Sequence, residues 1–256
     1  MASIFISGGA AGIGLATAER FGREGWTVGV YDVDKDALAA VQSRHPDWIT
    51  GELDVRDMQQ WEKALGEFTS HTGGTLDVLD NNAGVLVAGD LVEISADAVK
   101  AQIDIDVLGV TLGAKAAFPY LKATPGSHLV NIASASAIYG QPGIATYSAA
   151  KFYVAGLTEA LELEWAPHGV RVVGIWPLWA KTALADPKAK TTKTLGIKIT
   201  PDQVADKVWQ SVHPTTLDRR LHRTSYSVGE QTTVLANISK FSPNFATRLV
   251  NKVLAQ

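Results

Sequence analysis

The stretch that decides the fold reads Ser3-Ile-Phe-Ile-Ser-Gly-Gly-Ala-Ala-Gly-Ile-Gly14 and runs on into Leu15–Arg23. Its apolar start predicts a strand and its end a helix, so the glycines occupy a strand-to-helix turn. There Gly8 permits a tight bend, Gly12 lets the backbone approach a pyrophosphate, and Gly14 lets helix and strand pack closely. Unpaired N–H groups at the helix N-terminus favour phosphate binding. The stretch predicts a dinucleotide site, with a purely structural turn as the alternative.

Outside this stretch, short apolar runs alternate with segments of helical period, a pattern typical of repeated strand-helix units. Strands are expected over Ile4–Ser7, Thr27–Asp32, Ile49–Leu53, Val78–Asn81, Ser127–Ala133 and Val170–Trp176. Helices are expected at roughly 13–24, 35–44, 57–71, 96–122, 146–166 and 201–213, the last with Thr200 as N-cap. We therefore predict an α/β fold, a Rossmann-type doubly wound parallel sheet, in a single domain over residues 1–256.

The composition excludes several classes of partner and of catalytic site. Apolar residues make up 46% and charged residues 19% of the chain, and the net charge is −3, so nucleic acid is not an expected partner. The chain has no cysteine, which removes disulfides, thiolate nucleophiles and cysteine zinc sites. No leader and no long apolar segment is evident, and we expect a cytoplasmic protein with a small-molecule substrate and no metal.

Asp32 closes the second predicted strand, twenty residues after Gly12. An acidic side chain there accepts hydrogen bonds from the adenosine ribose and repels a 2′-phosphate, and neither Tyr31 nor Val33 supplies a cation. The sequence therefore favours NAD over NADP. The alternative is that Asp32 merely caps the helix that follows.

Tyr147-Ser-Ala-Ala-Lys151 places a phenol and an ammonium one helical turn apart. A nearby cation favours the phenolate and brings tyrosine closer to the range useful for proton transfer at neutral pH. Taken alone, the pair is also common on solvated helices.

The glycine turn, Asn81-Asn-Ala-Gly84, Ser134, Tyr147 and Lys151 follow one another in an order that resembles the short-chain dehydrogenase/reductase family. The resemblance spans roughly residues 3–182, and the glycine spacing is similar to that of its single-domain branch. It implies that Ser134 holds the substrate oxygen, Tyr147 exchanges its proton, and Lys151 binds the nicotinamide ribose and lowers the tyrosine pKa. The cofactor site it implies comprises Gly8, Gly12, Ile13, Gly14, Asp32, Asp54, Val55, Asn82, Ala83, Gly84, Tyr147, Lys151, Pro177 and Thr182.

Two positions depart from the family pattern. Asp106 stands where the family has an asparagine credited with holding a proton-relay water, and we count it among the candidate catalytic residues. Three interpretations remain open: a relay with altered pH dependence, a neutral substitution that faces water, and a loss of efficient catalysis. Leu178 follows Pro177 where the family has glycine. With Trp176, Trp179, Leu184 and Tyr139 it indicates an apolar substrate side.

Three further segments carry expectations about a substrate lid, about assembly and about the C-terminal tail. Residues 178–200 lack periodicity and are expected to be a substrate lid or a solvated loop. The long helices carry extra apolar residues, which favours a homodimer or homotetramer, with a deeper monomer core as the alternative. Those residues are Leu108, Leu112, Phe118, Phe152 and Leu163. The tail at about 243–256 is amphipathic, so it is expected to dock on protein, with contact to a membrane surface as the lesser alternative.

The function expected from this sequence is an NAD(H)-dependent oxidoreductase that interconverts a hydrophobic secondary alcohol and its ketone, with Tyr147 as the proton-transfer group. The alternatives are a noncatalytic NAD-binding regulatory protein, and an epimerase or dehydratase that uses bound NAD transiently. The intact Ser134, Tyr147 and Lys151 argue against the first, and the glycine spacing and chain length against the second.

Overall fold

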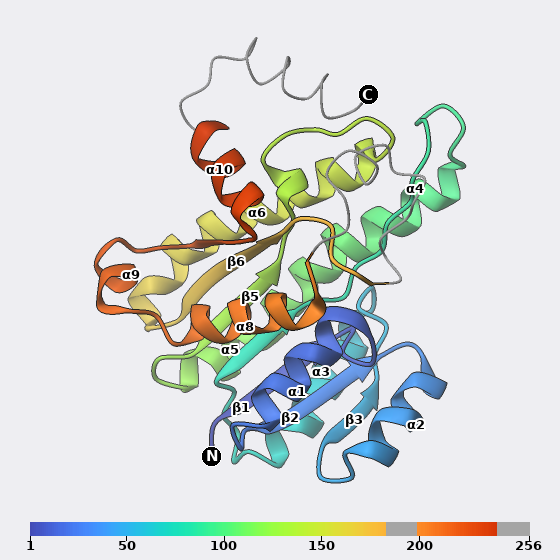
Figure 1. Cartoon of the computed structure of the whole chain (residues 1–256). Coiled ribbons are helices and arrows are strands. Elements are labelled where there is room, and N and C mark those ends of the chain that lie inside the picture. Colours follow the sequence, from blue (N-terminus) through green and yellow to red (C-terminus); the bar gives the residue numbers. More distant parts are fainter. Residues whose placement is uncertain (183–198, 240–256) are drawn as a thin grey trace.

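A seven-stranded, wholly parallel sheet forms the centre of the computed structural model, which describes residues 1–182 and 199–239 (Figure 1). Its order is β3-β2-β1-β4-β5-β6-β7, which confirms the predicted doubly wound α/β fold. The strands are β1 (Ser3–Ser7), β2 (Thr27–Asp32), β3 (Ile49–Glu52), β4 (Val78–Asn81), β5 (His128–Ile132), β6 (Arg171–Pro177) and β7 (Ser225–Val228).

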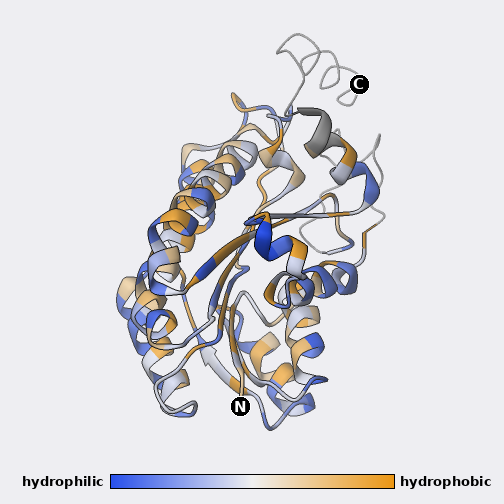
Figure 2. Ribbon diagram, turned by 90° about the vertical axis from the view of Figure 1, so that its left-hand side faces the viewer, coloured by the Kyte–Doolittle hydropathy of each residue, from blue (hydrophilic) through white to orange (hydrophobic). Residues whose placement is uncertain are grey.

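Helices cover both faces of the sheet, as the edge-on view of Figure 2 shows. They are α1 (Gly12–Gly22), α2 (Lys35–Arg44), α3 (Met58–Ser70), α4 (Ala96–Ile103), α5 (Val110–Ala123), α6 (Ala145–Trp165), α8 (Pro201–Val212), α9 (Thr216–Arg220) and α10 (Glu230–Ser239), with the short helices η1 (Asp104–Gly109), η2 (Ala135–Ala137) and η3 (Ala166–His168). One apolar core lies between the sheet and α1, α2 and α8, and a second lies between the sheet and α3, α5 and α6.

Side chains at their N-termini fix where several helices begin. Asp34, Asp57 and Ser95 each accept a backbone N–H from the first turn of α2, α3 and α4. Thr200 caps α8 as predicted, because its Oγ1 accepts from the N–H of Gln203 at 3.3 Å while Pro201 opens the helix. Helix α1 is different: Ala11 precedes it and provides no side-chain cap.

The strand order reverses direction between β1 and β4, which lie side by side in register, with Ser7 opposite Asn81. The chain leaves β1 toward one face and β4 toward the other, so the carboxyl ends of the two strands part and leave a crevice. The glycine loop, defined here as Gly8–Gly14, follows β1, and Asn82–Gly84 follows β4. Both predicted cofactor segments therefore meet at this edge of the sheet.

The structure corrects the predicted continuous helix over 96–122. A π-helical segment, η1, interrupts it between α4 and α5 and carries Asp106. Such wider turns occur frequently at functional sites. Strand β7 and helices α9 and α10 were not predicted. Most of the expected lid over 178–200 and the whole tail over 243–256 lie outside the described residues.

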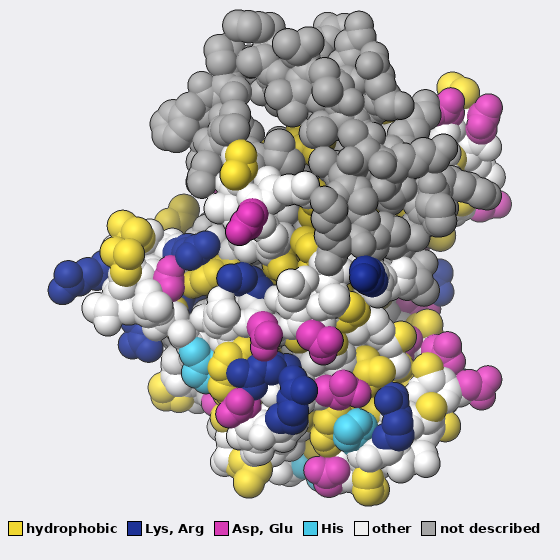
Figure 3. Space-filling view, in the orientation of Figure 1, with side chains coloured by type: hydrophobic (Ala, Val, Ile, Leu, Met, Phe, Trp, Pro, Cys, Tyr) yellow, Lys and Arg dark blue, Asp and Glu magenta, His cyan; other side chains and the backbone are white. Residues whose placement is uncertain are grey.

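The surface seen in Figure 3 intermingles basic and acidic side chains over α1 and α8. Arg20, for example, pairs with Glu24 at 2.6 Å and with Asp206 at 2.9 Å. This face therefore carries no field of a single sign. Within the described residues no helix is long and apolar enough to cross a membrane.

Candidate active site

The glycine loop is shaped by close packing against the segment after β4. Gly8 has a φ of +63°, and a Cβ there would lie 2.8 Å from the Cα of Ala83. A Cβ on Gly14 would lie 2.4 Å from the carbonyl oxygen of Gly8, so only glycine lets α1 approach the loop this closely. The side-chain amide of Asn82 donates to the carbonyl oxygens of Ser7 and Gly8 at 3.0 and 2.8 Å. Asn82 thus ties the two loops together.

Gly12 and the start of α1 face a cavity of about 500 Å³, a size typical of ligand sites. Gly12 has a φ of +54°, and Thr182 lies across from it, with its Cγ2 3.4 Å from where a Cβ of Gly12 would be. Ala11 provides no side-chain cap, so its side chain leaves the first N–H groups of α1 without an acceptor. This end of α1 is therefore suited to phosphate oxygens.

Asp32 lies at the end of β2 and lines the same cavity. Its Oδ2 accepts from the N–H of Ala10, in the glycine loop, and its Oδ1 from the N–H of Asp34, both at 3.2 Å. The N-cap of α2 is Asp34, whose Oδ1 accepts from the N–H of Ala37 at 3.0 Å. The capping alternative for Asp32 is therefore wrong. Its carboxylate is held toward the loop and the cavity.

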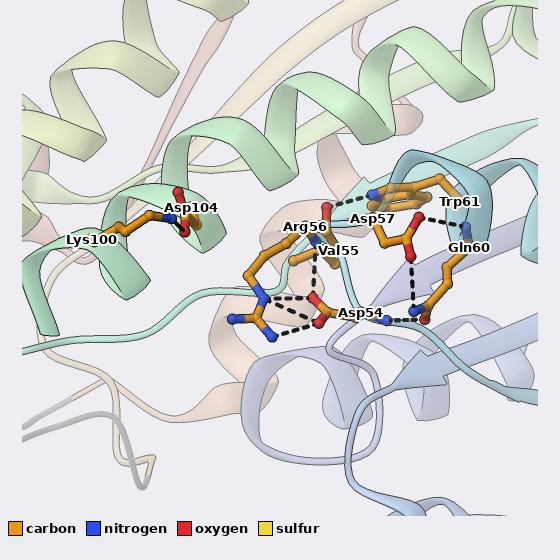
Figure 4. Close-up of polar contacts among 8 residues, drawn as sticks. All are labelled: Asp54, Val55, Arg56, Asp57, Gln60, Trp61, Lys100 and Asp104. Atoms are coloured by element: carbon orange, nitrogen blue, oxygen red, sulfur yellow. Dashed lines mark hydrogen bonds and ion pairs between the residues drawn. The ribbon is translucent and has the colours of Figure 1, made fainter. Parts of the chain in front are cut away.

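Asp54 forms a forked ion pair with Arg56, shown in Figure 4. Its Oδ1 accepts from Nε of Arg56 at 2.8 Å and its Oδ2 from Nη2 at 2.6 Å. This hydrogen bonding holds the pKa of the Asp54 carboxyl below its usual value. Helix α3 fixes the segment, because Gln60 accepts the N–H of Asp54 at 2.8 Å and the indole of Trp61 donates to the carbonyl of Val55 at 3.0 Å. Arg56 also lines the cavity, and the sequence reasoning missed it.

Ser134, Tyr147 and Lys151 converge on the cavity from two elements. Ser134 precedes η2, and Tyr147 and Lys151 lie one turn apart on α6. The Nζ of Lys151 donates to the carbonyl of Ile132, at the end of β5, at 3.0 Å and lies 5.4 Å from the centre of the Tyr147 ring. All three side chains are buried. Ser134 and Tyr147, thirteen residues apart in sequence, thus line the same cavity, and Lys151 lies beside Tyr147.

Burial raises the pKa of the Tyr147 hydroxyl above its ordinary value of 10.0. The positive charge of Lys151 lowers this pKa, as expected, and so does a hydrogen bond with Ser134, whereas the negative charge of Asp106 raises it. In this structure desolvation is the largest of these effects. Tyr147 is therefore held in its protonated form, ready to donate.

Asp106 lies behind this group, within η1 and fully buried. Its Oδ1 accepts from the N–H of Val85 at 2.8 Å, and a Cβ on Gly84 would lie 3.2 Å from that oxygen and 3.6 Å from Nζ of Lys151. Burial raises the pKa of the Asp106 carboxyl, and the charge of Lys151 partly offsets the rise. The interpretation of Asp106 as a neutral substitution that faces water is therefore wrong.

The cavity collects most of the predicted residues, but not all of them. Gly14 and Asp106 are absent from its walls: Gly14 packs behind the loop, and Asp106 lies beneath Gly84. The remaining candidates line it, namely Gly8, Gly12, Ile13, Asp32, Asp54, Val55, Asn82, Ala83, Gly84, Ser134, Tyr147, Lys151, Pro177 and Thr182.

The substrate side of the cavity differs from the expectation. Leu178 and Trp179 line it, whereas Trp176 packs in a separate apolar cluster and Tyr139 is not among the lining residues. Leu184 lies outside the described residues. Ser136 and Gln141 add polar groups that the sequence reasoning missed, since neither belongs to a motif with a recognised spacing. Among the described residues, no cluster of acidic and histidine side chains is suited to a metal ion.

Comparisons with known proteins identify the family of this chain. Residues 2–193 match the short chain dehydrogenase family. The meso-2,3-butanediol dehydrogenase of Serratia marcescens is 37% identical over 72% of this chain and 73% of its own length. The trans-4-hydroxycyclohexanecarboxylate dehydrogenase of Sinomonas cyclohexanicum is 35% identical over 70% and 72%.

Solved structures share the fold. A 3-ketoacyl-(acyl-carrier-protein) reductase from Brucella melitensis, complexed with NADH, superposes with a TM-score of 0.80 at 24% identity, over 89% of this chain and 96% of its own. A short chain dehydrogenase from Burkholderia cenocepacia, in complex with NADP, gives 0.82 at 21% identity over 98% and 97%. The chain therefore belongs to the short-chain dehydrogenase family, whose members are oxidoreductases that act on alcohol and carbonyl groups with a nicotinamide cofactor.

Proposed function

We propose that the protein interconverts a secondary alcohol and its ketone with NAD(H), using Tyr147 as the proton-transfer group. The observation that carries the proposal is the convergence of Ser134, Tyr147 and Lys151 on the same cavity as the glycine loop. The relatives named for a butanediol and for a hydroxycyclohexane carboxylate support a secondary alcohol.

In the reductive direction, the hydroxyl of Ser134 holds the carbonyl oxygen of the substrate beside Tyr147. Tyr147 donates its proton to that oxygen as negative charge develops on it. When bound, the nicotinamide supplies the hydride that goes to the carbonyl carbon, or takes it up from the alcohol in the reverse direction. Lys151 is fixed by the carbonyl of Ile132 and stabilises the phenolate that remains.

The cavity fits such a cofactor at its phosphate and ribose ends. The uncapped start of α1 suits the pyrophosphate, and Asp32 suits the ribose hydroxyls. The preference for NAD rests on charge. Lys35 pairs with Glu52 at 2.9 Å and Arg56 pairs with Asp54, so both cations that follow the two acidic strand ends are already neutralised. A 2′-phosphate would meet the carboxylate of Asp32, and among residues 1–182 and 199–239 neither of these paired cations is free to compensate.

Asp106 acts in this proposal as a positioning residue that sets the pH dependence of proton transfer. It anchors the backbone at Val85, and its carboxyl and the ammonium of Lys151 both face Gly84. The electrostatic coupling between the two groups favours a functional role over loss of catalysis.

The substrate is proposed to be largely apolar. Val85, Leu178 and Trp179 line the cavity that Tyr147 faces, and Trp179 also packs in the apolar cluster around Tyr147. An apolar group attached to the reacting carbon is stabilised there by its removal from water.

Assembly as a homodimer or homotetramer is proposed through α6 and η1. Leu108, Phe152 and Leu163 are exposed, whereas Leu112 and Phe118 pack into the protein's own core. Leu112 and Phe118 therefore belong to the core of the monomer, as in the alternative interpretation. The proposal of an interface rests on Leu108, Phe152 and Leu163.

The test is NADH oxidation measured across ketones of increasing bulk, repeated with NADPH. We expect turnover of apolar ketones with NADH, weaker turnover with NADPH, and loss of turnover in Tyr147→Phe. Binding of NADH without turnover of any ketone or alcohol would instead establish the noncatalytic regulatory alternative. Conversion of a sugar-like substrate without net change in NADH would establish the epimerase or dehydratase alternative.

A further inference from the structure

Two buried polar side chains line the cavity next to Ser134 and have no part in the proton chemistry above. They are Ser136, within η2, and Gln141, in the loop that leads to α6. Polar groups are costly to bury in an otherwise apolar wall unless their hydrogen bonds are satisfied. Their hydrogen bonds therefore indicate what this part of the cavity can bind.

The hydroxyl of Ser136 accepts a hydrogen bond from the side-chain amide of Gln141, which donates to its Oγ at 2.9 Å. The Oγ of Ser134 lies 3.3 Å from the same Oγ. When the single proton of Ser134 is directed at the reacting oxygen of the substrate, Gln141 still occupies one lone pair of Ser136 and leaves its O–H to donate. Accepting the hydrogen bond from Gln141 also polarises this hydroxyl and strengthens it as a donor.

Both groups are held at fixed positions relative to the proposed reacting centre. The backbone N–H of Ser136 donates to Oγ of Ser134 at 3.1 Å. The backbone N–H of Gln141 donates at 3.1 Å to Oγ of Ser148, the residue that follows Tyr147 on α6. The donor is therefore preorganised, so little ordering is needed when a substrate binds.

Resting on the proposed function, we propose that Ser136, held by Gln141, donates a hydrogen bond to a second oxygen on the carbon next to the reacting one. The substrate is then an α-hydroxy ketone in the reductive direction and a vicinal diol in the oxidative direction. The two serine hydroxyls lie 3.3 Å apart, which suits two oxygens on neighbouring carbons in a staggered arrangement. The apolar side chains of Val85, Leu178 and Trp179 line the same cavity and are available to the remainder of the substrate.

The experiment compares matched ketones with and without the second oxygen: acetoin with butanone, and benzoin with deoxybenzoin. NADH oxidation gives kcat/KM for the wild-type protein, Ser136→Ala and the control Ser211→Ala. The control removes a buried hydroxyl of α8 that donates to the carbonyl of Val208 and lies outside the cavity lining. Ser136→Ala should lower kcat/KM about tenfold for the hydroxy ketones and about twofold or less for the simple ketones. Ser211→Ala should leave the ratio within each pair unchanged.

Equal losses for both members of a pair would overturn the proposal, because Ser136 would then act only by positioning Ser134. A wild-type protein that favours the simple ketones would overturn it as well. If Ser136→Ala fails to fold in thermal unfolding, Gln141→Met takes its place, with a smaller loss expected for the hydroxy ketones alone.

A different result would overturn the proposed function itself. That result is either a wild-type protein that oxidises NADH with no ketone, including these four, or a Tyr147→Phe variant that retains full activity. A selective effect of Ser136→Ala combined with loss of all turnover in Tyr147→Phe would support both proposals.

Discussion

Asp80 places a carboxyl group in the apolar centre of the sheet, and replacing it with valine should raise the free energy of unfolding. The side chain is 0% exposed at the centre of the sheet, paired in register with Ile6 of β1 and Val130 of β5. Neither of its carboxyl oxygens has a hydrogen-bond partner among the described residues. Burial raises the pKa of this carboxyl from 3.8 to about 8.

The raised pKa of Asp80 determines how the free energy of unfolding changes with pH. Between the two pKa values the folded state keeps the Asp80 proton and the unfolded state loses it, so the free energy of unfolding decreases as pH rises. At 1.36 kcal/mol per pKa unit, the shift lowers the free energy of unfolding by at most about 2 kcal/mol at pH 5 and about 5 kcal/mol at pH 8. Asp80→Val removes this cost and the unpaired oxygens, at nearly the same volume.

The assay is urea unfolding of the wild-type protein and Asp80→Val at pH 5 and pH 8, with the exposed Asp47→Val as control. Asp80→Val should raise the free energy of unfolding at both values, and the gain should be about 3 kcal/mol larger at pH 8. A gain that does not change with pH, or a loss of stability at pH 8, would refute the reasoning, since either would mean that Asp80 has a partner in the folded protein.

Three further predictions concern the site and the assembly. Because burial raises the pKa of Tyr147, alcohol oxidation should become faster as pH rises from neutral into the alkaline range. Asp106→Asn removes a negative charge that also raises this pKa, so it should shift the pH–rate profile to lower pH. An unmoved profile would assign Asp106 no role in proton transfer. Asp32→Ala should raise the ratio of kcat/KM for NADP(H) over NAD(H) about tenfold, measured with one substrate, and a constant ratio would contradict the charge argument. Phe152→Glu should lower the mass seen in sedimentation, whereas an unchanged mass would place the subunit contact elsewhere.

Much of the fold could be predicted because burial on both faces leaves a strong apolar signal. The strands that begin at Ser3, Thr27 and Val78 lie in the interior of the sheet, and each was predicted to within a residue or two. Strand β7 was missed because Ser225–Val228 is short, alternates with polar residues and pairs only at the edge of the sheet. The π-helical turn at Asp104–Gly109 has no propensity signature, so a continuous helix was expected there.

The candidate site divides in the same way. The glycine loop, Ser134, Tyr147 and Lys151 could be placed from their spacing and from the family resemblance. Arg56, Ser136 and Gln141 could not, because their roles depend on contacts made only after the chain has folded. The burial of Asp106 likewise follows from the packing of η1 beneath Gly84, which the sequence does not reveal.

The central claim is that Tyr147 exchanges a proton with the substrate oxygen, and its most direct test is Tyr147→Phe measured beside Tyr153→Phe. Tyr153 lies on the same helix, is exposed and contacts Thr111, so it is a matched control. With NADH and the best ketone, Tyr147→Phe should lower kcat about 100-fold or more while leaving the Kd for NADH within about twofold, and Tyr153→Phe should change neither. Full kcat in Tyr147→Phe would contradict the account.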